Sequence, residues 1–290
     1  MIIVKVYGGL GNQLFQYFFG KALAEKYNTV VKYDLTFFSS SDNNEIRDFS
    51  IDKFNTNFHV ANSQEINNFK KNSNTINRIN KLTRILGIDK VLGNYYEELE
   101  EFKLDSKLIT SINDNKYFQG YWQSYEYLKG IEGLIKNEMV LDFKESENFK
   151  RVINDIEKNE SICLHVRRGD YVRLGWNLPL EYYTQALKKI TANIPNFKLF
   201  IFSDDKEWIL ENFQMASGEV ICINDFNFND YEELYLMSKC KHNIISNSTF
   251  SWWGAYLNSN KGKIVIAPHV WVKGLNVKDI EIIPPTWTVL

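Results

Sequence analysis

Residues 1–34 read MIIVKVYGGLGNQLFQYFFGKALAEKYNTVVKYD, and this stretch decides the fold class. Residues 2–7 form an apolar run typical of a buried strand, and a glycine-rich turn at residues 8–11 follows directly. Apolar side chains then recur with helical spacing at Leu14, Phe15, Phe18, Ala22 and Leu23. A second strand is predicted at residues 29–33, and a strand, a helix and a strand in immediate succession favour parallel pairing. The chain therefore opens as an α/β domain.

The second half of the chain repeats this alternation with greater regularity. Compact strands are predicted at residues 161–166, 198–203, 219–223, 242–246 and 263–267. Helices are predicted at residues 179–193, 206–213, 230–240 and 250–257. This order predicts a doubly wound parallel sheet, in which ligands bind beyond the carboxyl ends of the strands. The residues that follow each strand are therefore the first candidates for a functional site.

The part of the chain between these regions is less regular. Residues 39–44 are polar and loop-like, and residues 61–86 are rich in Asn and Lys with weak helical periodicity. A strand-like run, YFQGYW, occupies residues 117–122 and precedes a helical stretch that ends near residue 139. A length of 290 residues accommodates two modest domains. We expect an N-terminal domain at residues 1–155 and a C-terminal domain at residues 156–290.

Composition and charge exclude several classes of protein. The net charge of -2 and the pI of about 6.2 show no basic excess, so no nucleic-acid partner is expected. The three cysteines, Cys163, Cys222 and Cys240, are too scattered for a disulfide framework or a zinc cluster and are interpreted as core residues. The N-terminus has no basic start followed by a long apolar stretch. We expect a cytoplasmic protein without a transmembrane segment.

Five cations form a mildly basic stretch in the first half: Lys70, Lys71, Arg78, Lys81 and Arg84. Two interpretations fit them. They contact an anionic membrane surface, as in a peripheral membrane protein, or they form the solvated face of a helix. The second is the more common use of such a stretch.

The first chemical motif is the turn GGLGNQL at residues 8–14. Its glycines, Gly11 among them, let the backbone approach a ligand, and the N-terminus of the following helix suits an anionic or sugar ligand. A dinucleotide fingerprint is incomplete, because the third glycine is missing and only Asp34 follows the second strand as an acidic residue. A plain tight turn, with Asn12 as the helix cap, is the structural alternative.

The second motif is HVRRGDY at residues 165–171, which follows an otherwise apolar strand. Adjacent arginines point to opposite faces of a strand, so one can face a ligand while the other pairs with a carboxylate such as Asp170. The planar guanidinium fork matches a diphosphate, which points to Arg167 and Arg168 as anion-binding residues. The structural alternative for the arginines is an ion pair at a strand end. For His165, the structural alternative is that of an ordinary hydrogen-bonded histidine.

The third motif is SNSTFSWWGAYL at residues 246–257, where a strand ends in hydroxyl residues and enters a helix. Ser248, Thr249 and Ser251 offer hydrogen bonds to phosphate, and the helix dipole favours an anion there. The two tryptophans of this helix, at positions 252 and 253, are interpreted as packing residues. A weaker feature is Asp204 in FSDDKEW, which either accepts hydrogen bonds from a guanine edge or caps a helix.

These motifs, in this order, resemble the α-1,2-fucosyltransferases of glycosyltransferase family 11, and the resemblance extends from Gly8 to Trp253 and includes YFQGYWQS at residues 117–124. The resemblance implies a GT-B-like α/β fold with two Rossmann-like domains facing a central cleft. It also implies that the C-terminal domain binds GDP-fucose and that the N-terminal domain is largely the acceptor side. Terminal galactose in an oligosaccharide of a bacterial surface glycan, such as an O-antigen, is the expected acceptor.

The resemblance also assigns roles to single residues. Arg167 would hold the β-phosphate with the support of Arg168, and Asn12 would lie near the fucose and the reacting oxygen. The remaining nucleotide-binding residues implied in this way are Gly11, His165, Asp204, Ser248, Thr249, Phe250 and Ser251.

The chemistry of such a transfer makes further predictions. Negative charge grows on GDP when its bond to fucose breaks, and Arg167 is the residue we expect to stabilise it. No two aspartates are separated by one residue, so a D-x-D metal motif is missing and a reaction without metal or other cofactor is expected. Attack from the opposite face of GDP-β-L-fucose gives an α-1,2-linked product by inversion. No general base is assigned; Asp34 is one possibility, with loop capping as the more common role.

Three rival functions remain at this point. A fucosyltransferase of different linkage would share the donor motifs. A non-catalytic protein that binds nucleotide sugars or glycans would share the fold, although the intact arginine pair argues against it. A dinucleotide oxidoreductase is disfavoured by the incomplete glycine fingerprint.

Overall fold

The computed structural model describes residues 1–39, 47–71, 73–86, 93–106, 108, 115–192, 194, 196–213 and 219–290. Most of the loop predicted at residues 39–44 lies outside the described residues. The chain divides into two compact units. The first unit comprises Met1–Val140 and Ile280–Ile282, and the second comprises Leu141–Asp279 and Ile283–Leu290. None of the described helices is both long and apolar enough to cross a membrane.

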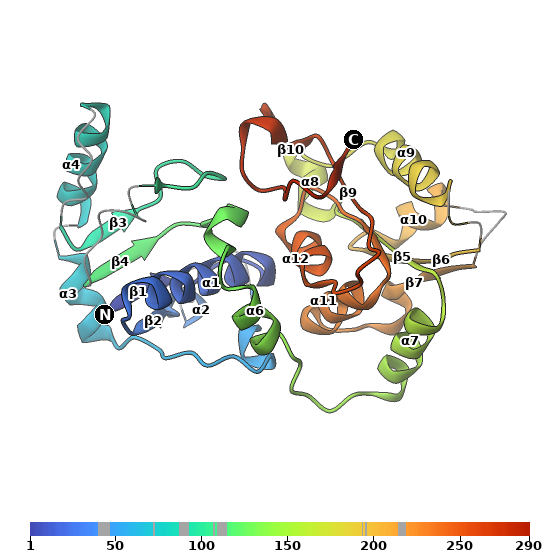
Figure 1. Cartoon of the computed structure of the whole chain (residues 1–290), viewed down its shortest axis with the longest axis horizontal. Coiled ribbons are helices and arrows are strands. Elements are labelled where there is room, and N and C mark those ends of the chain that lie inside the picture. The colour runs from blue at the N-terminus through green and yellow to red at the C-terminus, as the bar shows by residue number, and fades with distance from the viewer. Residues whose placement is uncertain are drawn as a thin grey trace. The chain divides into compact units, whose positions relative to one another are not determined.

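The first unit is built on a four-stranded parallel sheet (Figure 1). Its strands are β1 (Ile2–Lys5), β2 (Val31–Asp34), β3 (Tyr95–Glu97) and β4 (Lys116–Gln119), in the order β2-β1-β4-β3. The helix α1 (Leu10–Tyr27) connects β1 to β2 and packs against both strands, and the predicted parallel pairing is confirmed. The other elements are α2 (Thr36–Ser39), η1 (Ile51–Lys53), α3 (Ser63–Lys70), α4 (Ser73–Ile85), η2 (Tyr125–Leu128) and α6 (Glu132–Glu138).

The second unit is built on a six-stranded parallel sheet in the order β12-β9-β8-β5-β6-β7. The strands are β5 (Ser161–Val166), β6 (Lys198–Ser203), β7 (Glu219–Cys222), β8 (His242–Ile244), β9 (Val265–Ala267) and β12 (Thr288–Val289). The helices are α7 (Glu147–Lys158), α8 (Gly169–Leu174), α9 (Leu180–Thr191), α10 (Lys206–Asn212), α11 (Asp230–Lys239) and α12 (Thr249–Leu257). Short elements complete the unit: η3 (Ile223–Phe226), the hairpin β10 (Val270–Val272) and β11 (Leu275–Asn276), and η4 (Val277–Asp279). Each strand and helix predicted in this half is present, with ends that shift by up to two residues.

Helices cover both faces of this second sheet. Side chains of α9 and α10 pack with Ile162, Leu164 and Leu199 on one face, and side chains of α7 and α11 pack with Cys163 and Phe200 on the other. Alternate strand residues therefore supply the two cores, as a doubly wound sheet requires. All three cysteines are free and buried, which confirms their interpretation as core residues. The two tryptophans of α12 are fully buried, which confirms that they are packing residues.

The boundary between the units differs from the predicted one. The sequence analysis placed it between residues 155 and 156, whereas the units divide between Val140 and Leu141. The reason is α7, whose buried Phe149, Val152 and Ile156 pack on the second sheet. The apolar spacing of α7 predicts a helix, but it does not say which of two sheets that helix covers.

Candidate functional site

The carboxyl edge of the second sheet gathers the predicted nucleotide-binding residues of that unit. The strands β8, β5 and β6 are neighbours, so the residues that follow them lie at one edge. The rings of His165 and Phe250, which come from β5 and α12, are 5.8 Å apart, and the carboxylate of Asp204 after β6 contacts the arginines after β5. The residues brought together here are His165, Arg167, Arg168, Asp204, Ser248, Thr249, Phe250 and Ser251.

Arg167 is held by two carboxylates. Its Nη2 lies 2.7 Å from Asp170 Oδ1 and its Nη1 lies 2.7 Å from Asp204 Oδ2. The guanidinium also lies over the ring of Tyr171, with 5.5 Å to the ring centroid. Its side chain is 25% exposed, so the guanidinium remains open to solvent although its fork is already oriented. Two carboxylates on one guanidinium fix its geometry and also compete with an incoming anion.

Arg168 turns to a different partner. Its Nε donates to Asp205 Oδ2 at 2.8 Å, and its guanidinium stacks over the ring of Trp208 at 4.4 Å. Asp205 also caps α10 by accepting a hydrogen bond from the backbone N–H of Trp208. The bond from Arg168, followed by that backbone bond, lowers the pKa of Asp205. The two guanidinium groups therefore pair with different carboxylates. The sequence predicts that one arginine faces a ligand while the other pairs with a carboxylate, whereas both are paired here and Asp170 pairs with Arg167.

Asp204 organises the arginine pair. One carboxylate oxygen accepts from the backbone N–H of Arg168 at 2.7 Å, and the other pairs with Arg167. The helix cap predicted as its alternative role belongs instead to the next residue, Asp205. A Cβ at Gly169 would lie 2.7 Å from Asp204 Oδ2, so the glycine of the RRGD stretch permits the close approach. Contact with a guanine edge stays a prediction for Asp204, whereas its contacts in the structure support a role in orienting the arginines.

His165 is a neutral imidazole. Its side chain is buried, and burial together with the neighbouring Arg167 lowers its pKa to about 3. The ring Nδ1 lies 2.8 Å from the hydroxyl of Ser246, which in turn lies 3.4 Å from the hydroxyl of Ser251. At neutral pH this histidine supplies hydrogen bonding and shape, while the positive charge of the edge comes from the arginines.

The first turn of α12 is capped by its own serine. Ser248 accepts a hydrogen bond from the backbone N–H of Phe250, and its carbonyl accepts one from the hydroxyl of Ser251. The side chain of Ser251 is buried, so its hydroxyl serves the turn itself. Thr249 and Phe250 are partly exposed, which leaves them and the backbone of the turn as the surface available to an anion.

The glycine turn of the first unit also lies at the carboxyl edge of its sheet. Gly8 has φ +80°, a conformation that favours glycine, and Gly9 is the N-cap of α1 with open space where a Cβ would lie. Gly11 is buried in the first helical turn. The proposed capping role of Asn12 is wrong, because α1 begins at Leu10 and no side chain caps it. The Asn12 Oδ1 instead accepts a hydrogen bond from Gln123 Nε2 at 2.9 Å.

Two buried glutamines of α1 were not predicted as part of this edge. Gln13 Nε2 donates to the carbonyls of Gly8 and Asp48, at 2.9 and 2.8 Å. Gln16 accepts from the backbone N–H of Tyr7 and donates to the carbonyl of Gly120, so it ties the end of β1 to the end of β4. Their signal in the sequence is the presence of two amides on a helix face that is otherwise apolar.

Two carboxylates follow strands of this sheet and differ in character. Asp34 is fully buried and accepts from Tyr117 Oη at 2.6 Å, from the backbone N–H of Thr36 and from Lys70 Nζ at 3.0 Å. Burial acts to raise its pKa, but these hydrogen bonds outweigh burial and the pKa lies below the ordinary value. The capping alternative for Asp34 is therefore confirmed, and a base role is disfavoured.

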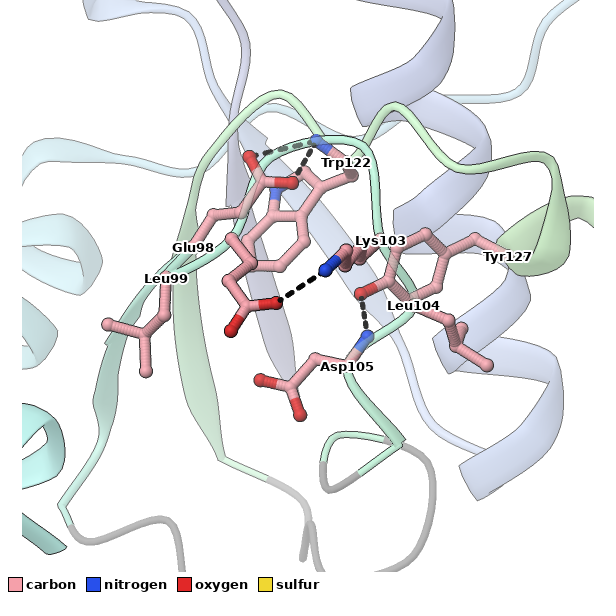
Figure 2. A pocket seen from close by; sticks show the side chains of 8 residues that line it. Glu98, Leu99, Lys103, Leu104, Asp105, Trp122 and Tyr127 are labelled. Atoms are coloured by element: carbon pink, nitrogen blue, oxygen red, sulfur yellow. Dashed lines mark hydrogen bonds and ion pairs between the residues drawn. The ribbon is translucent and has the colours of Figure 1, made fainter. Parts of the chain in front are cut away.

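Glu98, which sequence reasoning missed, follows β3 and lines a hollow together with Trp122 and Tyr127 (Figure 2). Its carboxylate accepts from the backbone N–H groups of Tyr121 at 2.6 Å and of Trp122 at 3.1 Å. Burial, with a smaller contribution from nearby Glu101, raises its pKa to about 7 although these hydrogen bonds act to lower it. The indole Nε1 of Trp122 is buried without a hydrogen-bond partner, so the hollow has one unmatched donor beside a carboxylate.

Within the described ranges, no group of three or more His, Cys, Asp or Glu side chains is arranged to hold a metal ion. The positive charge of the edge described above comes from Arg167 and Arg168.

Two α/β units, each with a parallel sheet, and an arginine pair at a strand edge are features of enzymes that use nucleotide sugars. The comparisons place this chain among glycosyltransferases. The whole chain, residues 1–290, matches the family Glycosyl transferase family 11. The protein belongs to glycosyltransferase family 11, which confirms the resemblance stated above. One relative is the O-antigen biosynthesis glycosyltransferase WbnK of Escherichia coli, 29% identical over 93% of this chain and 94% of its own.

The names of two other relatives include the sugar that each transfers. An α-1,2-colitosyltransferase of Escherichia coli is 27% identical over 99% of this chain and 98% of its own. The galactoside α-(1,2)-fucosyltransferase 2 of Gorilla gorilla gorilla is 27% identical over 48% of this chain and 44% of its own.

Solved structures share the fold at low identity. The fucosyltransferase NodZ from Bradyrhizobium matches with a TM-score of 0.50 and 13% identity, over 87% of this chain and 91% of its own. POFUT1 in complex with GDP matches with a TM-score of 0.50 and 13% identity, over 91% and 97%. The predicted GT-B-like α/β class is therefore confirmed.

Proposed function

We propose that this glycosyltransferase transfers L-fucose from GDP-β-L-fucose to the 2-hydroxyl of a terminal galactose, with inversion to an α-1,2 linkage. The observation that carries the proposal is the pair of arginines, each oriented by carboxylates, beside the first turn of α12 at one strand edge. A relative named for α-1,2-colitosyl transfer supports the linkage. A relative named as a galactoside α-(1,2)-fucosyltransferase supports the linkage and the acceptor. The proposal places the reaction in the cytoplasm, on an oligosaccharide of a surface glycan.

Leaving-group stabilisation is the main chemical task in this proposal. Arg167 is partly exposed and pre-oriented, so its guanidinium meets the β-phosphate without a large loss of side-chain entropy. Asp170 has to share or release Arg167 when the diphosphate arrives, whereas Asp204 also holds the backbone of Arg168 and stays in place. Arg168 supports the site through Asp205 and Trp208. In this proposal the guanidinium supplies the charge, so no metal is required.

The acceptor proton needs a destination, and Glu98 is our candidate. It is a carboxylate at the carboxyl edge of the first sheet with a pKa of about 7, the range in which a general base is most effective at neutral pH. The end of β4 carries Tyr121, whose backbone N–H bonds Glu98 and whose ring lies 4.9 Å from that of Tyr7. Glu98 therefore belongs to the same edge as the glycine turn and Asn12.

The decisive experiment measures GDP release with a galactose-terminated oligosaccharide in the presence of EDTA, followed by linkage analysis of the product. GDP-fucose, GDP-colitose and GDP-mannose are compared as donors, because one relative is named for colitosyl transfer. Turnover with GDP-fucose and an α-1,2-fucosylated product supports the proposal in full. A preference for GDP-colitose would show that the donor is GDP-colitose and not GDP-fucose, and a different linkage would show that the proposed product is wrong. Activity restored only by added metal would overturn metal independence.

Substitution of Arg167 tests the mechanism. We expect Arg167→Ala to lower kcat by about a hundredfold or more, because a charged donor to the leaving group is lost. We expect the kcat of Arg167→Lys to lie between those of the wild type and Arg167→Ala, because lysine keeps the charge but loses the planar fork. Lys189→Gln on the exposed part of α9 is the matched control for loss of one positive charge. Equal kcat in wild type and Arg167→Ala would contradict the assigned role.

A further inference from the structure

The helix α4 packs on the first unit through one face. It lies beyond β3, the edge strand of the sheet (Figure 1). Ile76 of α4 packs close to Gly93, Asn77 donates a hydrogen bond to Glu97 at the end of β3, and Asn80 is buried. These residues define the inner face of the helix.

The outer face of α4 exposes large apolar side chains. Ile79 is 40% exposed, Leu82 59% and Ile85 80%, and Leu86 directly after the helix is 73% exposed. Positions 79, 82 and 86 follow the three- and four-residue spacing that places side chains on one side of a helix, and position 85 adjoins them. Single exposed apolar residues are ordinary, but four together on one helix face mark an interaction surface.

Positive charge surrounds this apolar stripe. Lys71, Arg78 and Lys81 are exposed, and Arg84 adds a fourth cation to the same segment. No Asp or Glu occurs in the sequence between Glu65 and Asp89, although the whole chain carries a net charge of -2. Lys70 of this stretch serves the fold through its ion pair with Asp34. The basic stretch is therefore a local asymmetry attached to an apolar face.

The combination of apolar and basic groups selects the partner. A second copy of this chain meeting through the same face would bring like charges together across a symmetric contact. A nucleic acid would use the cations but leave the leucines and isoleucines without a partner. An anionic bilayer surface matches both, because its headgroups attract Lys and Arg while its acyl boundary accepts Leu and Ile. The helix has 13 residues, so it lies in the surface and does not span the bilayer.

We propose that α4 and Leu86 form an interfacial helix that attaches this enzyme to membranes rich in anionic lipid. Attachment of this kind places the first unit against the bilayer, where an acceptor carried on a lipid would be found. The attachment itself requires neither donor nor turnover, so it is testable whether or not the proposed transfer is correct.

The test measures partition of the full chain onto vesicles by flotation. One set of vesicles contains phosphatidylglycerol mixed with phosphatidylcholine, and the other contains phosphatidylcholine alone. We expect binding to the anionic vesicles, weakened by salt, and little binding to the neutral ones. Two variants dissect the surface: Leu82→Ser with Ile85→Ser removes apolar contact, and Arg78→Gln with Lys81→Gln removes charge. We expect each pair to weaken partition by about tenfold or more.

Matched controls come from the second unit. Leu210→Ser on α10 removes an apolar side chain that is 57% exposed, and Lys188→Gln with Lys189→Gln removes two neighbouring exposed cations of α9. We expect both controls to bind like the wild type, and all variants to keep the wild-type melting temperature. Absence of binding to anionic vesicles would overturn the proposal, and so would equal loss in variants and controls. A dimer in solution that Leu82→Ser with Ile85→Ser dissociates would reassign the face to self-association.

Discussion

Two carboxylates at the edge of the first sheet show how strongly single residues depend on their partners. Asp34 and Glu98 both follow strands, yet the buried carboxylate of Asp34 accepts hydrogen bonds from a lysine and a phenol, while the partly buried carboxylate of Glu98 accepts them from two backbone N–H groups. Burial therefore prevails at Glu98, and its pKa rises to about 7, whereas hydrogen bonds prevail at Asp34. A sequence shows an acidic residue after a strand but not which groups donate to it.

The raised pKa of Glu98 predicts the pH dependence of activity. If Glu98 takes the acceptor proton, only its ionised form works, so kcat/KM rises with pH through about 7. We expect Glu98→Gln, which keeps the shape and the capacity to accept from backbone N–H groups, to lower activity and to abolish this rise. The measurement is the pH profile of kcat/KM for both proteins. A variant that keeps wild-type activity and the same profile would exclude Glu98 as the base.

The same pKa makes a prediction for stability. The folded state holds a proton on Glu98 up to about pH 7, whereas the ordinary pKa of glutamate is 4.5. The stabilisation from that proton is fully present below 4.5 and is lost as pH rises through 7. We therefore expect wild type to lose stability relative to Glu98→Gln between about pH 5 and about pH 8, measured by urea unfolding. A stability difference that does not change with pH would show that the pKa of Glu98 is ordinary.

Gly169 has a specific role at the arginine pair. An added Cβ would lie 2.7 Å from Asp204 Oδ2, which pairs with Arg167. We expect Gly169→Ala to displace that carboxylate and to reduce kcat/KM for the donor by about tenfold, since a small misplacement of a phosphate-binding group is costly. Gly262→Ala is the matched control, because a Cβ there meets nothing within 4 Å. Equal donor kinetics in the two variants would contradict the orienting role of Asp204.

At the scale of elements, the two glycines at the start of α1 are expected to differ in role: one is needed for the backbone conformation, and the other leaves space for a ligand. Gly8 has φ +80°, so we expect Gly8→Ala to lower the free energy of unfolding by about 1 kcal/mol or more. Gly9 has φ -73° and open space at its Cβ, so we expect Gly9→Ala to change stability by less than about 1 kcal/mol. If a sugar or phosphate approaches the turn at Gly9, this variant still loses activity. Chemical unfolding and GDP release on both variants check the distinction, and full activity in Gly9→Ala would show that no ligand approaches there.

The elements that sequence patterns predict and miss differ in a physical way. The strands and helices of the second half are compact apolar or periodic runs, so pattern and structure agree there. The helix α8 has only six residues and none of them is buried, so it carries no apolar periodicity that would reveal it. The motif HVRRGDY is predicted from the sequence to bind an anion, but the sequence does not predict that it continues as a helix. Local patterns thus identify elements that have an apolar face of their own and miss a short helix that buries no residue.

At the scale of the whole molecule, the chain passes between the two units three times, at residues 140/141, 279/280 and 282/283. The predicted boundary missed the first of these by fifteen residues because it was drawn just before a strand, and the helix α7 that precedes this strand belongs to the same unit. The later excursion of Ile280–Ile282 into the first unit has no local signal. Its contacts are backbone bonds of Glu281 with Phe102 and Tyr125, which pair residues far apart in the sequence.

The division into two units predicts where nucleotide binding changes the molecule. If the arginine edge holds GDP, binding stabilises the second unit by about 2.7 kcal/mol when GDP is present at about a hundred times its Kd. Hydrogen exchange on the full chain, with and without GDP, measures this unit by unit. We expect added protection in α8, in the start of α10 and in α12, with smaller changes around the glycine turn of α1. Arg167→Ala is the control, because it should bind GDP more weakly and lose most of the added protection. Protection concentrated in the first unit would move the nucleotide to the other sheet and reverse the assignment of donor and acceptor sides.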